Sequence, residues 1–573
     1  MARPLSYAAG LLTRGGMLAL LAAGGSALIP ASAYADACSA VSSASNCVTM
    51  WNADLVDFTV QSSAPWVNGP PEVANQIAIV GSAMYDAVNA ATGGLYQPTR
   101  YNVGAATTAS ATAAALAAGY GTLMGIFAPV IDPTTNQAVA GNPLAGLGTL
   151  TNSDTFGGLL ATLPAPAGKP SASLSIVAKI QSDYQAALRQ LDTTDTSVQA
   201  GLALGSAQAL ATLTARLSDQ SVVAIKDGLN MNAPANQGTA GVYTPPATRP
   251  EMYPLWGTVT PWSVSSSTQY APPPPPAITS AAYAASLFAT ECVGSGAALP
   301  SGLASSCATA QAAAQASASA FTNTSALSAG TIWNATTYGQ LVTADGLVQP
   351  TNSQLGLYWN DPGGTLQPPG HWLQITDTVA TNAGLDVMQS ARITAEVGQA
   401  TADAGITAWE AKYDNNLWRP IAAINDCSGW NSGFTCDSGW SSVIATPPHP
   451  DYIAGHPAFS YAAATVLQDF FGTASSSFCS TSDPYINGSG GAAIGSMTLC
   501  YNNFIDAASD ATVSRVYGGI HTDLATAASA TVGLQIGQNL VATSFQEVPE
   551  PATLALFGTG VAGLAALRRR RRT

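Results

Sequence analysis

Charged side chains are scarce in this 573-residue sequence, and cations are scarcer than anions. Asp, Glu, Lys and Arg supply 9% of the residues, and 18 Lys and Arg face 32 Asp and Glu, for a formal net charge of −14. Nucleic acids are bound through basic surfaces, so this balance excludes them as expected partners. It fits a globular enzyme or binding protein. Because only 11 Lys and Arg fall within residues 36–546, the position of each is informative.

Strand-like alternation of polar and apolar residues is also scarce, and no repeat of fixed period occurs. The first absence disfavours a β-sheet protein and the second a solenoid. Alanine-rich stretches with apolar residues three and four positions apart predict helices instead, within residues 71–91, 171–217, 378–418 and 457–471. We therefore expect an all-α fold, a large helical bundle that forms one unit over residues 36–546.

The first 35 residues have the features of a signal peptide. Arg3 and Arg14 precede an apolar run over residues 17–29, and Ala33–Ala35 supplies the small-residue pattern at which signal peptidases cleave. The run is shorter than the roughly 20 residues that a membrane span requires, which disfavours a transmembrane anchor. We expect export and cleavage after residue 35.

The last 27 residues, 547–573, have a second targeting pattern. Pro-Glu-Pro at residues 549–551 is followed by an apolar stretch over residues 552–567 and by Arg568–Arg572. This order resembles the PEP-CTERM sorting signal of Gram-negative bacteria, which implies a sorting protease as partner and only transient contact with the membrane. The implied location is the cell surface or the extracellular matrix. A plain C-terminal anchor is the alternative.

None of the eight cysteines has the CxxC spacing that is typical of zinc sites. An even number of cysteines in an exported protein favours disulfides. Proximity along the chain suggests four pairs, although eight cysteines allow 105 connectivities. The expected pairs are Cys38 with Cys47, Cys292 with Cys307, Cys427 with Cys436, and Cys479 with Cys500.

Two of the few cations, Lys412 and Arg419, lie seven residues apart at the end of a predicted helix. Seven residues span two helical turns, so both side chains can point to one side of the helix. Two cations that approach one another repel unless an anion lies between them. The pair is therefore a candidate anion site, with solvated surface charge as an equally acceptable interpretation.

Two further motifs combine cations, glycines and histidines. Gly455 and His456 follow a proline-rich loop at the start of an apolar helix, where free backbone N–H groups favour an anion. Arg515 and His521 flank a Gly-Gly pair that lets the backbone turn. Each motif alone is weak, because loop histidines are often structural.

Taken in order, K-x6-R-P, then G-H, then S-R-x5-H resembles the signature of the vanadium haloperoxidase and type-2 phosphatidic acid phosphatase superfamily. The resemblance is strongest over residues 357–523, and the core site is expected within residues 357–525. It extends to Leu-Tyr-Trp-Asn-Asp at 357–361 and Pro-Pro-Gly-His-Trp at 368–372, and residues 51–52 and 83–90 are similar to the family's first helices. It implies the family's helical fold and vanadate as cofactor.

The resemblance also implies a role for each site residue. His521 would be the single protein ligand of vanadium, and His456 would handle protons while hydrogen peroxide binds. The vanadate oxygens would be held by Lys412, Arg419, Arg515 and the backbone N–H of Gly455. Asp361 would orient His456, with a turn aspartate before Pro362 as the alternative. Halide oxidation by peroxide to a hypohalous species is the implied activity.

One residue departs from the family pattern: Ala454 stands where most members carry a serine. Losing one hydrogen bond to an anion should cost roughly 1.5–3 kcal/mol of affinity. A soluble phosphohydrolase that uses the same site is a second hypothesis, since phosphate and vanadate share shape and charge. A non-catalytic surface or matrix protein with a degenerate pocket is the third.

His449, seven residues before His456, bears on the choice of halide. Bromoperoxidases of the family tend to carry histidine at this place, and chloroperoxidases tend to carry phenylalanine. A second imidazole makes the pocket more polar and should weaken the oxidising power directed at chloride. We expect oxidation of bromide and iodide with little oxidation of chloride, although Trp409 is shared with the chloroperoxidase pattern. A structural loop histidine is the alternative.

Overall fold

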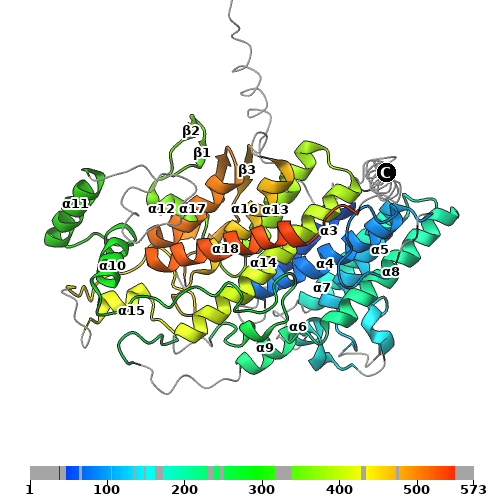
Figure 1. Ribbon diagram of the computed structural model, residues 1–573, viewed down its shortest axis with the longest axis horizontal. Coiled ribbons are helices and arrows are strands. Elements are labelled where there is room, and N and C mark those ends of the chain that lie inside the picture. Colours follow the sequence, from blue (N-terminus) through cyan, green and yellow to red (C-terminus); the bar gives the residue numbers. More distant parts are fainter. Residues whose placement is uncertain are drawn as a thin grey trace, which may run out of the picture.

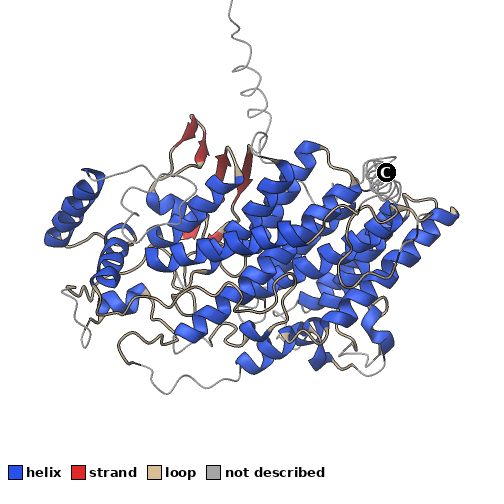
Figure 2. Ribbon diagram, viewed as in Figure 1, coloured by secondary structure: helices blue, strands red, loops and turns tan. Residues whose placement is uncertain are grey.

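Helices dominate the protein in this computed structural model, and the few strands are short (Figure 2). The structure describes residues 38, 47–62, 68–104, 106, 108–132, 137–147, 150–161, 172–229, 238–245, 251–316, 337–427, 434–472, 477–488 and 491–548. The expected all-α fold is confirmed. The expected signal peptide lies outside the described residues, as does the sorting segment from residue 549 onward.

The described helices of the first part of the chain run up to residue 316. They are α3 (Cys47–Ser62), α4 (Pro70–Ala91), α5 (Ala111–Phe127), η1 (Pro143–Leu147), η2 (Asn152–Asp154), α6 (Phe156–Ala161), α7 (Ala172–Leu188), α8 (Thr196–Arg216), α9 (Ser221–Leu229), η3 (Trp256–Thr258), α10 (Ala281–Val293) and α11 (Ser301–Ala316). Helices α3, α4, α5, α7 and α8 pack on one another (Figure 1).

The second part begins at residue 340 and contains the described strands. Its elements are β1 (Gln340–Thr343), β2 (Gly346–Val348), α12 (Asn352–Tyr358), α13 (Gln367–Ala383), α14 (Val387–Asn415), α15 (Pro420–Asn425), α16 (Gly455–Phe471), β3 (Phe478–Thr481), β4 (Tyr485–Ile486), β5 (Ala493–Ile494), β6 (Thr498–Tyr501), α17 (Phe504–Tyr517) and α18 (Asp523–Thr543). An antiparallel sheet has the order β2-β1-β6-β3, and β4 pairs with β5.

Helix α14 connects the two parts of the fold. It packs against α4 on one side and against α16 and α18 on the other, and Figure 1 shows it running through the middle of the molecule. Small residues permit the close contact with α4: a Cβ added to Gly398 would lie 2.9 Å from the backbone of Ala78, and one added to Gly81 would lie 3.1 Å from the backbone of Ala395. The α4–α14 pair therefore forms a tight crossing that fixes the direction of α14.

Two of the expected helical stretches are each divided into two helices. Residues 171–217 contain α7 and α8, because Asp195 caps the start of α8 by accepting a hydrogen bond from the Ser197 N–H. Residues 378–418 contain the end of α13 and all of α14. Gly384 adopts a left-handed conformation (φ 64°) that ends α13, and Asp386 then forms a capping box at the start of α14. These local caps override the continuous apolar periodicity.

All four expected disulfides are present in the structure: Cys38–Cys47, Cys292–Cys307, Cys427–Cys436 and Cys479–Cys500. The last of these joins the facing residues of β3 and β6. Among the residues that the structure describes, no helix combines the length and the hydropathy needed to cross a membrane.

Candidate oxyanion site

Five of the predicted site side chains come together from three separate places in the chain. Lys412 lies in the last turn of α14, and Arg419 precedes α15. His456 lies in the first turn of α16, Arg515 in the last turn of α17, and His521 between α17 and α18. The ends of four helices and the loop before α18 therefore form one cluster.

Lys412 and Arg419 do not lie on one continuous helix, as their spacing had suggested. Helix α14 ends at Asn415, and Asn416 turns the chain with a left-handed conformation (φ 44°). Arg419 follows on extended backbone (φ −81°, ψ 154°). The two cations converge because of this turn, and burial followed by the charge of Arg419 holds the pKa of Lys412 well below its usual range.

Arg419 links two of the histidines. Its Nη1 lies 3.0 Å from Nε2 of His521 and donates to the carbonyl of Ile520 at 2.7 Å. Its Nη2 lies 2.9 Å from Nδ1 of His449, and its Nε donates to the His449 carbonyl at 2.6 Å. A guanidinium only donates, so Nε2 of His521 and Nδ1 of His449 are acceptors here. The predicted residue His449 is therefore part of the cluster.

Arg515 is placed in the same manner beside His456. Its Nη1 lies 3.0 Å from Nε2 of His456, and its Nη2 donates to the carbonyl of Gly356 at 3.3 Å. Burial lowers the pKa of Arg515 to about 10, and the nearby charge of Asp361 opposes this. Nε2 of His456 accepts the guanidinium hydrogen bond, which leaves the proton of a neutral ring on Nδ1.

Asp361 bonds to a different histidine from the one expected. Its carboxylate lies 3.1 Å from Nδ1 of His371, and His371 Nε2 lies 3.3 Å from both the Tyr358 hydroxyl and the Ser480 hydroxyl. The expected pairing with His456 is therefore replaced by a buried Asp361–His371 pair. His371 follows Asp361 by only ten residues, at the start of α13, and its ring bonds to the Asp361 carboxylate.

Asp451 is the site residue that sequence reasoning missed. Its carboxylate is fully buried, lies 2.6 Å from Nδ1 of His521 and accepts a hydrogen bond from the Thr522 hydroxyl at 3.0 Å. Burial raises its pKa to about 6, against the opposing charges of Arg419 and Lys412. The available signal was an acidic residue two positions after His449, inside the proline-rich loop.

The cluster is strongly positive for a buried site. Lys412 donates from Nζ to the carbonyl of Pro450 at 2.8 Å, which satisfies one of its protons without neutralising its charge. Burial lowers the pKa of Arg419 to about 10. Burial, followed by neighbouring cations, also holds the pKa values of three histidines well below their usual range: His449, His456 and His521. Lys412, Arg419 and Arg515 outnumber the nearby carboxylates of Asp451 and Asp361, and buried charges without full compensation are costly, so the cluster favours an anion.

The start of α16 adds a further feature suited to an anion. Ala454 is the N-cap and offers no side-chain hydrogen bond, so it leaves the first backbone N–H groups of the helix uncapped. A Cβ added to Gly455 would approach the Trp409 ring at 3.2 Å, so glycine is the residue that fits here. Together with the guanidinium, ammonium and imidazole groups, this N-terminus fits a tetrahedral oxyanion.

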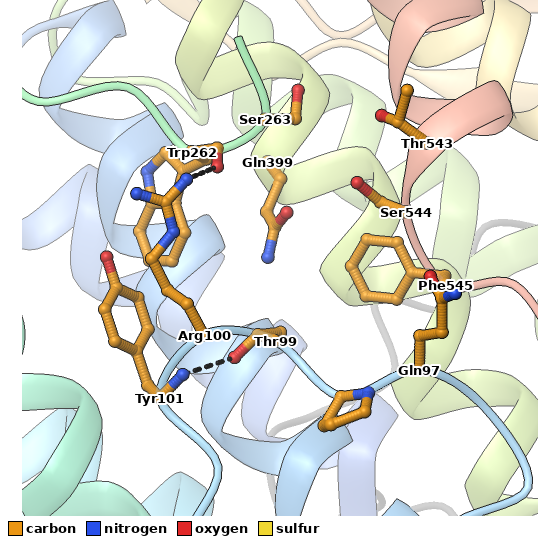
Figure 3. A pocket seen from close by; sticks show the side chains of 11 residues that line it. Gln97, Thr99, Arg100, Tyr101, Trp262, Ser263, Gln399, Thr543, Ser544 and Phe545 are labelled. Atoms are coloured by element: carbon orange, nitrogen blue, oxygen red, sulfur yellow. Dashed lines mark hydrogen bonds between the residues drawn. The ribbon is translucent and has the colours of Figure 1, made fainter. Parts of the chain in front are cut away.

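A solvent-open cavity of about 260 Å³ lies elsewhere, between the segment at 97–101, residues 262–263, α14 and the end of α18 (Figure 3). Gln399 points into it from α14. Gln399 precedes Lys412 by 13 residues, or about 20 Å along the helix axis. The cavity is therefore separate from the cation cluster. Within the described ranges, no group of three or more His, Cys, Asp or Glu is arranged to hold a metal ion.

Comparison with known proteins shows which families the second part of the chain resembles. Residues 392–548 match the family model of the VCPO second helical-bundle domain, and residues 547–571 match the PEP-CTERM protein-sorting motif. These two parts of the chain are therefore similar to those two families, as the sequence signature had indicated. The sorting motif and the four disulfides are consistent with an exported protein.

Individual relatives agree with this classification. Over 143 residues the chain is 28% identical to a vanadium chloroperoxidase of Curvularia inaequalis, an alignment that covers 21% of this chain and 23% of the relative. The chain thus matches about a quarter of that relative's length. A bacterial vanadium-dependent iodoperoxidase structure has a TM-score of 0.57 at 18% identity, with 88% of this chain and 97% of the other covered. A bacterial vanadium-dependent chloroperoxidase structure has a TM-score of 0.50 at 15% identity, with coverages of 83% and 93%. The chain therefore has the helical fold of vanadium haloperoxidases.

Proposed function

We propose that this protein is a vanadate-dependent haloperoxidase that uses hydrogen peroxide to oxidise halide to a hypohalous species. The convergence of Lys412, Arg419 and Arg515 with the imidazoles at the start of α16 and before α18 carries the proposal. Such a set of buried donors binds and polarises an oxyanion in a way that a solvated surface cannot. Bound vanadate would supply Lewis-acid activation of peroxide without changing its own oxidation state.

The residues of this chain have distinct tasks in the proposed reaction. Nε2 of His521 would be the single protein ligand of the metal, and Lys412, Arg419, Arg515 and the backbone N–H of Gly455 would hold the vanadate oxygens. His456 accepts and returns protons at Nε2, the atom that faces Arg515. Burial, followed by the charge of Arg515, lowers its pKa, so the imidazole is neutral near pH 7 and has a lone pair at Nε2. Asp361 would act through Arg515 and His371 rather than by direct contact with His456.

A phosphohydrolase remains the second candidate, because the same geometry suits phosphate. His521 Nε2 is an acceptor whose opposite nitrogen is held by a carboxylate, which is also the arrangement of a nucleophilic histidine. Ala454, which removes a hydroxyl donor from the oxyanion site, supports the third candidate, a non-catalytic surface protein. For all three candidate functions, we propose that the protein is exported to the surface or matrix of a Gram-negative bacterium. A sorting protease would process residues 547–573.

One experiment separates these candidates. Residues 36–546 are purified, loaded with orthovanadate and assayed in parallel for peroxide-dependent bromination and for p-nitrophenyl phosphate hydrolysis. Bromination that is lost in His521→Ala is the expected result, whereas His371→Ala, which removes a buried histidine outside the cation cluster, should retain part of the activity. Phosphate release without bromination would support the phosphohydrolase, and neither activity would support the non-catalytic protein.

We further propose that His449 directs the enzyme to bromide and iodide. Its ring lies beside Arg419 and 5.1 Å from the Trp409 ring, so it lies at the edge of the cation cluster. An imidazole here adds polarity and a proton site, whereas phenylalanine would leave this edge apolar. Wild type should turn over bromide and iodide much faster than chloride, and His449→Phe should raise the chloride-to-bromide rate ratio. Equal chloride and bromide turnover in wild type at mildly acidic pH would contradict this assignment.

A further inference from the structure

The two nitrogens of His521 face opposite environments. Nδ1 lies 2.6 Å from the Asp451 carboxylate, and Nε2 lies 3.0 Å from the Arg419 guanidinium. A carboxylate only accepts hydrogen bonds and a guanidinium only donates them. In a neutral imidazole the proton therefore lies on Nδ1, and the lone pair of Nε2 points into the cation cluster.

We propose that Asp451 is a positioning residue that holds His521 in this tautomer and increases the electron-donating power of Nε2 toward a bound vanadium. The proposal rests on the proposed function, in which His521 Nε2 would bond to vanadium. A ligand histidine commonly donates its second ring N–H to such an acceptor, which orients the ring and raises its basicity.

The local structure holds Asp451 in place from three sides. The Thr522 hydroxyl donates to the second carboxylate oxygen at 3.0 Å, while the same hydroxyl oxygen accepts the Ala525 N–H as the cap of α18. The Asp451 N–H donates to the carbonyl of Leu417 at 2.9 Å. Lys412 Nζ donates to the neighbouring carbonyl of Pro450. The carboxylate thus joins the start of α18 to the ring of His521, and the backbone of Pro450 and Asp451 joins the proline-rich loop to the end of α14.

A carboxylate at this position has opposite effects on two kinds of anion. Its negative charge lowers the net positive potential of the cluster. It should therefore lower the affinity for an anion that is held by charge and hydrogen bonds alone. The same carboxylate should raise the affinity for an anion that also bonds to Nε2 of His521. Inorganic phosphate is a probe of the first kind and orthovanadate of the second. A residue that merely maintained the fold would change both affinities in the same direction.

The test compares wild type with Asp451→Asn, which keeps size and an acceptor oxygen but removes the charge. Calorimetric titration should show orthovanadate binding about 10- to 100-fold weaker in the variant, while phosphate binds as tightly as in wild type or more tightly. Thr522→Val is the matched control, because it removes the other hydrogen bond to the carboxylate and leaves the His521 contact. It should retain most of the vanadate affinity.

Proton NMR supplies a readout that needs no vanadate. The chain has only four histidines, so the ring N–H signals of His521 can be assigned by substitution. A strongly downfield Nδ1–H signal is expected in wild type and in Thr522→Val, with an upfield move in Asp451→Asn and loss in Asp451→Ala. Absence of this signal from wild type, or an equal loss of vanadate and phosphate affinity in Asp451→Asn, would overturn the proposal. Failure of wild type to bind vanadate while the signal is present would instead overturn the proposed function and leave the Asp451–His521 assignment supported.

Discussion

Ala454→Ser is the substitution that tests the oxyanion site most directly. Ala454 is fully buried, caps α16 without a side-chain hydrogen bond (φ −69°, ψ 143°), and stands immediately before Gly455. A serine hydroxyl can accept a helix N–H and donate its own proton to an anion at the same time. The N-cap hydrogen bond should add about 1 kcal/mol to the free energy of unfolding. The bond to the anion should add roughly 1.5–3 kcal/mol to its binding.

The second of these figures corresponds to an increase of about tenfold to hundredfold in vanadate affinity. Calorimetric titration with orthovanadate gives the affinity, and urea denaturation of the anion-free protein gives the change in stability. Ala454→Gly serves as the control, because it alters the cap position without adding a donor. A serine variant that is stabilised by the cap but binds vanadate no better than wild type would show that the hydroxyl faces the helix alone. The start of α16 would then not be part of the oxyanion site.

Two further predictions concern stability. Burial raises the pKa of Glu72 to about 8 from an unfolded value near 4.5. Between these two pH values the folded state retains a proton that the unfolded state releases, so the free energy of unfolding falls as pH rises from 4.5 to about 8. The Glu72→Gln variant should have the same free energy of unfolding as wild type at pH 4 and a value about 4 kcal/mol higher at pH 8. Urea denaturation at the two pH values tests this, and parallel pH profiles of wild type and variant would contradict it. Replacing Cys479 and Cys500 together by serine opens a 21-residue loop and should cost about 3 kcal/mol. An unchanged melting temperature would refute that estimate.

The helices and most of the cluster could be predicted because their signals are local in the chain. Apolar residues at three- and four-residue spacing mark a helix wherever tertiary packing agrees with it, as in α4 and α16. The two helix breaks were missed because a short cap outweighs periodicity, as Gly384 and Asp386 show. The cations could be identified because so few exist: a Lys or Arg in a chain with 9% charged residues stands out against its surroundings.

The pairing of the acids with the histidines could not be read from the sequence in the same way. Asp451 and His521 are 70 residues apart, and an aspartate between proline and tyrosine has the composition of an ordinary turn. Asp361 was assigned to His456 by resemblance, whereas the structure pairs it with His371. Which carboxylate meets which imidazole depends on how α13, α16 and α18 pack, and hydrophobic periodicity carries no information on that choice.

The tight α4–α14 crossing bears on the site as well as on the fold. Gly398 and Gly81 let the two backbones approach, and this contact sets the axis of α14, at whose far end Lys412 meets the proline-rich loop. Arg419 then depends on the turn at Asn416, and its guanidinium reaches both His449 and His521. Buried cations are stable only in a geometry that supplies them with acceptors, and here carbonyl groups of the adjoining loops supply them. Asp451 offsets part of this positive charge, and under the proposed function a bound oxyanion would offset the remainder at a site that the packing around α14 holds in place.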